Sequence, residues 1–163
     1  MPIVLKQFIR IVDVINKIIG WVLALALGVM TVLIFWQVFA RYVVGNSLTF
    51  SEEVSRFLMI WMTFLGAAYA IRQGTLIAVD ILPDFTKGKL SKAIKITSYL
   101  VALIFYFVLI KFGWEMSQSV SFQTSPAISI SMFWPMLATS VGGVLMFINT
   151  IAVLIEEIFR KEE

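Results

Sequence analysis

The sequence predicts an all-α integral membrane protein with four transmembrane helices. Its 163 residues are 60% hydrophobic and 14% charged, whereas soluble domains are about half apolar and about a quarter charged. The apolar residues form continuous runs without inside–outside alternation, which is typical of spanning helices and not of membrane β-barrels. The chain is too short for a second sizeable domain, so we expect a single membrane domain over residues 1–163.

Each expected span follows from an apolar run, because about 20 mainly apolar residues cross roughly 30 Å of hydrocarbon. The first run, 18–40, contains no charged residue. The second and third uncharged runs are 57–71 and 96–110, and the fourth lies near the C-terminal end. With their ends included, the expected spans are about 18–43, 52–72, 93–114 and 131–155.

The segment before the first span, residues 1–17, predicts a helix of another kind. Lys6, Arg10, Asp13 and Lys17 recur at helical spacing, with aliphatic and aromatic residues between them. This amphipathic pattern favours an N-terminal helix lying in the membrane interface, and a tilted beginning of the first span fits the same residues. A cleavable signal peptide is not indicated, because the first apolar run is too long for one.

Lysine and arginine are divided unevenly between the two sides of a four-span chain. Ten of the thirteen lie in the N-terminal segment, the loop between the second and third spans, and the C-terminal segment. The other side holds Arg41, Arg56 and Lys111. Because positively charged segments stay in the cytoplasm, we expect both termini there. The first and third loops then face outward, which is the periplasm in a Gram-negative bacterium.

Charged residues stand close to both ends of the second span. Its uncharged run, 57–71, covers only about 22 Å at 1.5 Å per residue, less than the hydrocarbon thickness. Glu53 and Arg56 precede this run and Arg72 follows it, so these charges lie at or inside the hydrocarbon boundary. A charge at the membrane centre costs about 2.5–3.5 kcal/mol on insertion scales, and pairing reduces the cost.

The outer ends of the first two spans are therefore expected to share a charge cluster. Glu52 and Glu53 stand four and three residues before Arg56, so either acid can pair with it on one helix face. Thr49 and Glu52 form a capping box that begins the helix here. Two interpretations are open: the cluster only fixes the hairpin between the spans, or it is a docking face for a partner protein. The expected members are Gln37, Arg41, Glu52, Glu53 and Arg56.

Small residues in the second span favour close helix packing. Gly66 and Ala70 are four residues apart, and small residues let membrane helices approach closely. A helix of this chain and a helix of another protein are both compatible with this pattern. Trp61 is typical of an interfacial anchor or a packing residue.

The composition excludes several classes of function. The chain has no cysteine and no histidine, which excludes thiol catalysis, disulfides, histidine bases and most metal or haem sites. We expect no enzyme activity, no cofactor and no bound metal. The small net charge of +3 reflects loop placement and not nucleic-acid binding. No carboxylate stands in the middle of a span and no pair of broken helices is indicated, so transport by this chain alone is not expected.

A longer pattern runs through roughly residues 30–145. The stretch WQVFARYVVGNSLTFSEEVSRFLMIWMTFLGAAYAIRQG, followed by VDIL, contains R-Y, E-E-x-x-R, W-x-x-F-L-G-A-A, R-x-G and V-D in order. This combination resembles the small membrane subunit, of the DctQ or SiaQ type, of tripartite ATP-independent periplasmic (TRAP) transporters. The chain departs from the family at Leu76, where a histidine is frequent, and at Ser140, where a proline is common.

The resemblance implies a subunit of a sodium-coupled importer of organic acids, such as C4-dicarboxylates or sialic acid, in a bacterial inner membrane. Such a subunit scaffolds and anchors a large elevator-type transport subunit and helps to dock the substrate-loaded periplasmic binding protein. Expected partners are these two proteins and membrane lipid, and not nucleic acid. The alternative is a self-sufficient, homo-oligomeric small transporter or channel, which would need a polar pore lining. The candidate interface or structural residues are Gln37, Arg41, Glu52, Glu53, Arg56, Trp61, Gly66, Arg72, Gly74 and Asp80.

Overall fold

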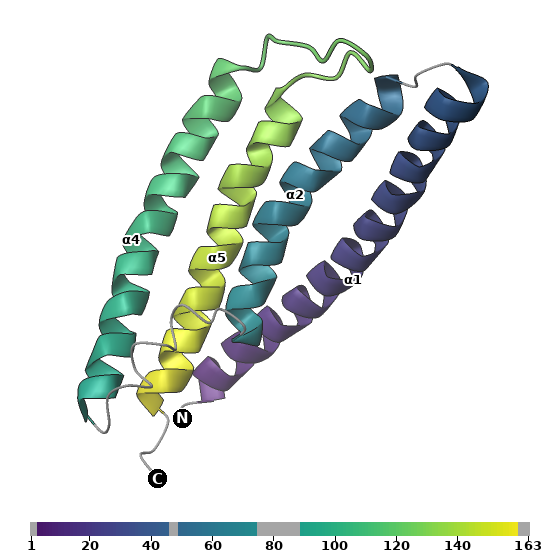
Figure 1. The fold of residues 1–163 in the computed structure, drawn as a ribbon. Coiled ribbons are helices and arrows are strands. Elements are labelled where there is room, and N and C mark those ends of the chain that lie inside the picture. Colours follow the sequence, from purple (N-terminus) through teal and green to yellow (C-terminus); the bar gives the residue numbers. More distant parts are fainter. Residues whose placement is uncertain (1–2, 46–48, 75–88, 160–163) are drawn as a thin grey trace.

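The computed structural model describes residues 3–45, 49–74 and 89–159. In these ranges the chain forms four long α-helices and no β-strand (Figure 1), which confirms the predicted all-α class. All four helices are long and apolar enough to cross a membrane. They are α1 (Ile3–Phe39), which the π-helical turn η1 (Ala40–Val44) extends, α2 (Thr49–Gln73), α4 (Lys89–Ser119) and α5 (Phe133–Phe159).

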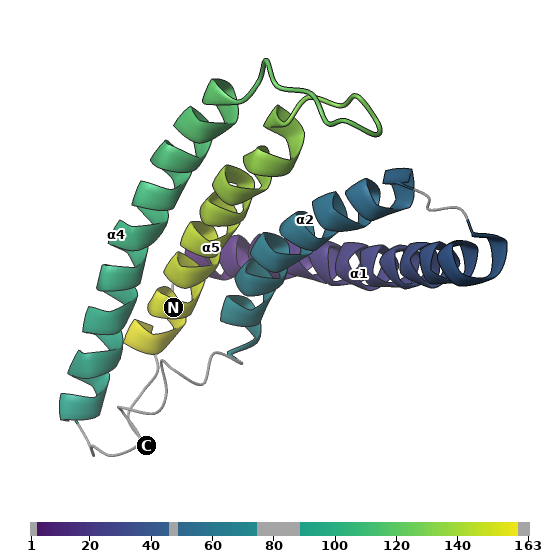
Figure 2. The same ribbon diagram turned by 45° about the horizontal axis from the view of Figure 1, so that its top comes forward.

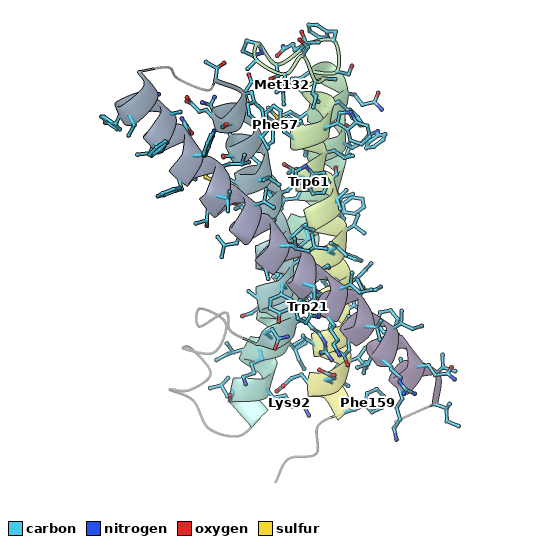
Figure 3. All side chains as sticks on the ribbon, turned by 90° about the vertical axis from the view of Figure 1, so that its right-hand side faces the viewer. Trp21, Phe57, Trp61, Lys92, Met132 and Phe159 are labelled. Atoms are coloured by element: carbon cyan, nitrogen blue, oxygen red, sulfur yellow. The ribbon has the colours of Figure 1, made fainter. Side chains whose placement is uncertain are left out.

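Helix α1 is continuous from Ile3 to Phe39, so the segment 3–17 is helical and continues the axis of the first span. Its 37 residues would extend about 55 Å, much more than the hydrocarbon thickness of a bilayer. Figure 3 shows that α1 crosses the other helices obliquely. A helix of this length can therefore begin outside the hydrocarbon and still cross it.

One narrow stripe of α1 faces the rest of the chain. Along this stripe buried and half-buried residues recur every three or four positions, and most residues between them are exposed. This spacing is that of left-handed helix packing, in which two helices stay in contact over a long distance. It explains why α1 lies along α2. The stripe consists of Val12, Asn16, Ile19, Leu23, Ala26, Met30, Leu33, Gln37 and Ala40.

The four helices form a row and not a closed bundle. α4 packs on α5, α5 packs on α2, and α2 packs on α1, with a smaller contact between α1 and α5. Among the described residues α2 and α4 do not pack together, because α5 lies between them (Figures 1 and 2). This arrangement buries α5 and leaves broad faces of the outer helices uncovered.

Two neighbouring glycines of α5 allow its close contacts on both sides. A Cβ atom on Gly142 would lie 2.5 Å from the Cβ of Phe64 in α2. A Cβ atom on Gly143 would lie 3.0 Å from a side-chain carbon of Ile110 in α4. The α2–α5 contact continues into a small buried core around Ala68 of α2.

Candidate functional site

The polar residues gather at the two ends of the row. α1 begins and α5 ends at one end, which we call the terminal end (Figure 1). At the opposite end, which we call the hairpin end, α1 and α4 end and α2 and α5 begin. The predicted charge cluster lies at the hairpin end, and Arg72 lies at the terminal end.

Glu52, Arg56 and Gln37 form the exposed part of the predicted cluster. Arg56 Nη2 donates to Glu52 Oε1 at 3.3 Å, and Gln37 Nε2 donates to Glu52 Oε2 at 3.5 Å. The structure thus brings these three residues together, and Gln37 connects α1 with α2. The Arg56 and Glu52 side chains are 61% and 48% exposed, so their ion pair adds little stability. Arg41 lies in η1 at the same end.

Glu53 has different bonding partners from Glu52. It is 9% exposed and makes no ion pair within 4.0 Å to any described residue. Its Oε2 atom accepts hydrogen bonds from Ser125 Oγ and from the backbone N–H groups of Ala127 and Ile128, the latter two at 3.0 Å. Glu53 therefore fixes the α4–α5 connection onto the first turn of α2.

The α4–α5 connection, residues 120–132, has its own internal hydrogen bonds. The N–H of Ser125 donates to the Ile130 carbonyl at 2.9 Å, and the N–H of Met132 donates to the Gln123 carbonyl at 2.9 Å. Thr124 and Ser131 form an isolated antiparallel bridge. The connection is thus a folded hairpin-like loop, and Glu53 holds its tip.

Arg72 joins three helices at the terminal end. Its Nε donates to Asp13 Oδ1 in α1 at 2.7 Å. Its Nη1 and Nη2 donate to the two carboxylate oxygens of Glu156 in α5, at 2.6 and 2.8 Å. The Arg72 side chain is 11% exposed, so its guanidinium is largely shielded from solvent, whereas the Asp13 and Glu156 side chains are 51% and 42% exposed. Sequence reasoning selected Arg72 but did not identify its two acidic partners.

A buried amide pair lies next to this network. Asn16 Nδ2 donates to Asn149 Oδ1 at 2.7 Å, and Asn149 Nδ2 donates to Asn16 Oδ1 at 2.9 Å. Asn149 Nδ2 also donates to the Ala68 carbonyl at 2.6 Å. The pair therefore fixes α1, α5 and α2 relative to one another. Sequence reasoning missed both residues, although Asn149, an asparagine within the apolar run of the fourth span, was a usable signal.

The remaining candidate residues have separate positions. Trp61 is half-buried near the middle of α2 (Figure 3). Gly74 follows α2 with a φ of +65° and donates its N–H to the Ile71 carbonyl at 3.3 Å, so it ends the helix. A Cβ atom on Gly66 would meet no heavy atom within 4 Å, so Gly66 does not pack against another described helix. Asp80 lies outside the described residues.

α2 has a third face, which neither α1 nor α5 covers in its membrane-spanning part; at the hairpin end Gln37 of α1 contacts Glu52 on this face. We call it the outer face of α2; its residues recur every three or four positions and are exposed or half-buried. In the membrane-spanning part, small residues dominate this face. The exposed surfaces of α1 and α4 are bulky instead, with residues such as Leu25, Phe35, Ile104 and Phe107. The outer face of α2 consists of Glu52, Arg56, Met59, Thr63, Gly66, Ala70 and Gln73.

These features define a class of protein. The chain is a multi-pass membrane protein whose buried polar contacts join helices and loops to one another. Within the described ranges, no group of three or more histidine, cysteine, aspartate or glutamate side chains could hold a metal ion.

The chain belongs to the DctQ component family of the tripartite ATP-independent periplasmic transporters, whose family model matches residues 30–160. It is 27% identical over 145 residues to a putative TRAP transporter small permease protein of Haemophilus influenzae, covering 89% of this chain and 90% of that protein. It is 27% identical over 143 residues to the sialic acid TRAP transporter small permease protein SiaQ of Vibrio cholerae, covering 87% of this chain and 80% of that protein.

A longer relative matches as well. Over 137 residues the chain is 26% identical to the sialic acid TRAP transporter permease protein SiaT of Haemophilus influenzae, covering 84% of this chain and 22% of that protein. The resemblance that the motifs indicated is thereby confirmed. The family is one of transporter subunits and not of enzymes, and the chain is a multi-pass protein of the inner membrane.

Proposed function

We propose that this chain is the small permease subunit of a sodium-coupled TRAP importer of organic acids, of the C4-dicarboxylate or sialic acid class. It scaffolds and anchors the large elevator-type transport subunit and helps to dock the substrate-loaded periplasmic binding protein. Family membership supports this role. So does the relative SiaT, in which a region similar to this chain is one part of a longer permease.

The proposed orientation places the terminal end in the cytoplasm and the hairpin end in the periplasm. The distribution of lysine and arginine supports it, because ten of the thirteen lie in segments assigned to the cytoplasmic side. In this orientation residues 3–17 of α1 lie in the cytoplasmic interface. Their mixture of apolar residues with Lys6, Arg10 and Lys17 suits contact with lipid headgroups.

The observation that carries the scaffold role is the composition of the outer face of α2. Small residues let two membrane helices approach closely, whereas contact with lipid alone gives no reason for them. Thr63, Gly66 and Ala70 lie in the membrane-spanning part of this face. Glu52 and Arg56 lie on the same face at the hairpin end, and ionisable groups at membrane depth usually face protein. We infer that a helix of the large subunit packs along this face.

Replacing Gly66 with leucine is expected to weaken assembly with the large subunit. Because the added side chain enters open space in this chain, the fold should tolerate it, whereas a closely packed partner helix should not. We expect about tenfold less large subunit to co-purify, with a matching loss of substrate uptake. Both quantities can be measured after expression of the two subunits together.

The matched control is Gly28→Leu. A Cβ atom on Gly28 in α1 also meets no heavy atom within 4 Å, and Gly28 lies away from the outer face of α2. This variant should assemble and transport normally. Normal assembly of Gly66→Leu, or a loss confined to Gly28→Leu, would show that the large subunit does not pack on this face.

A further inference from the structure

Glu53 is a buried charge that forms no ion pair with a described lysine or arginine. It is the single charged residue among the described residues that is buried. Its three hydrogen bonds all end on Oε2, and none of them ends on Oε1. Arg56, the nearest base on the same helix, forms its ion pair with Glu52 instead. Because a buried carboxylate is costly unless it is paired and hydrogen-bonded, the bonds that the described residues make to Glu53 leave Oε1 open to a further donor.

A pocket of about 330 Å³ opens beside this carboxylate at the hairpin end. Its volume is at the lower end of the range for ligand pockets, roughly 300–1,000 Å³, and suits the end of one long side chain. One wall comes from α2 and the other from the loop that Glu53 holds. The lining residues are Thr49, Glu52, Glu53, Arg56, Pro126 and Ala127.

The lining favours a cationic occupant. It contains two carboxylates and one guanidinium, and the guanidinium of Arg56 is already paired with Glu52. The remaining negative charge is that of Glu53. A calcium ion does not fit well, because it needs six to eight oxygen ligands and the described lining offers only two carboxylates, one of them already paired with Arg56. A guanidinium or ammonium group needs only one strong acceptor and a second polar neighbour.

The position of the pocket indicates which protein supplies the cation. Glu52 and Arg56 belong both to the pocket lining and to the outer face of α2. The pocket therefore continues the surface along which a helix of the large subunit is inferred to pack. We propose, resting on that function, that this pocket receives a lysine or arginine side chain of the large subunit. This side chain donates to Glu53 Oε1. The contact thereby fixes the position of the two subunits relative to each other along the membrane normal.

The test uses the absence of cysteine from the chain. A Thr49→Cys variant places one thiol at the pocket. If this variant folds poorly, Ala127→Cys places the thiol on the opposite wall instead. Each variant is treated with a cationic reagent, 2-(trimethylammonium)ethyl methanethiosulfonate, and with an anionic one, 2-sulfonatoethyl methanethiosulfonate. The labelling rate is read by mass spectrometry of this chain. Phe122→Cys, on the same loop and 79% exposed, is the reference.

In the isolated full-length chain, the cationic reagent should label the pocket about tenfold faster than the anionic one, after correction by the reference. Adding Glu53→Gln should remove most of this preference. In the complex with the large subunit, labelling at the pocket should fall at least about tenfold, while Phe122→Cys stays reactive.

Three results would overturn the inference. One is equal labelling by both reagents in the isolated chain. Another is a pocket that stays reactive in a complex that has formed, which separates failure of this inference from failure of the proposed function. The third is a pocket cysteine that is protected from labelling only after the periplasmic binding protein is added, because this result would assign the pocket to the binding protein. Absence of any complex with the wild-type chain contradicts the proposed function itself.

Discussion

Replacing Gly142 with alanine is expected to lower the free energy of unfolding by about 3 kcal/mol, at the upper end of the usual cost of overpacking. The added Cβ would lie 2.5 Å from the Phe64 Cβ and 3.3 Å from two Phe64 backbone atoms. Backbone atoms cannot rotate away as the end of a flexible side chain can. α2 and α5 must therefore separate, and the midpoint of thermal unfolding in detergent should fall by several degrees.

The control for this change is Gly66→Ala on α2. The added methyl group meets no heavy atom within 4 Å, so the isolated chain should keep its unfolding midpoint or gain slightly from the better helix former. Equal midpoints for the wild type and Gly142→Ala would mean that the α2–α5 contact is looser than described.

Replacing Arg72 with glutamine is expected to lower the free energy of unfolding by about 2–3 kcal/mol. The change removes three charge-assisted hydrogen bonds and leaves Asp13 and Glu156 close together without their cation. Removal of one partner from a fully buried pair costs about 3–5 kcal/mol. The expected loss is smaller here because the Asp13 and Glu156 side chains are 51% and 42% exposed.

Arg56→Gln provides the comparison, because it breaks an ion pair whose two members are both well exposed. This change should lower the free energy of unfolding by less than about 1 kcal/mol, so the unfolding midpoint should fall only slightly. A double change, Arg72→Gln with Glu156→Gln, should recover part of the loss by removing an uncompensated charge. Similar effects of Arg72→Gln and Arg56→Gln would contradict the idea that Arg72 holds three helices together.

Local composition and spacing were sufficient to predict the helices and the contacts within one helix. Apolar runs of sufficient length must form helices in lipid, because every backbone N–H and C=O then has a partner within its own segment. The contact between Glu52 and Arg56 was predictable in the same way, because residues four apart meet on a helix. These predictions need no knowledge of how the helices are arranged.

The contact of Gln37 with Glu52, between the neighbouring ends of α1 and α2, was expected, but contacts between segments farther apart in the sequence could not be predicted from these patterns. Glu53 bonds to residues 72 to 75 positions later, and the partners of Arg72 lie 59 and 84 positions away. Hydropathy also did not reveal the narrow stripe of α1 that faces the rest of the chain. In a membrane helix the lipid-facing and protein-facing residues are both apolar, so only Asn16 and Gln37 mark the stripe as unusual.

The most direct test of the central claim is purification of this chain from its native membrane in a mild detergent, followed by mass spectrometry of what accompanies it. The proposed function predicts recovery of a large multi-span permease in stoichiometric amount. Recovery of this chain alone, as a defined homo-oligomer, would contradict the subunit role. It would instead assign the outer face of α2 to self-association.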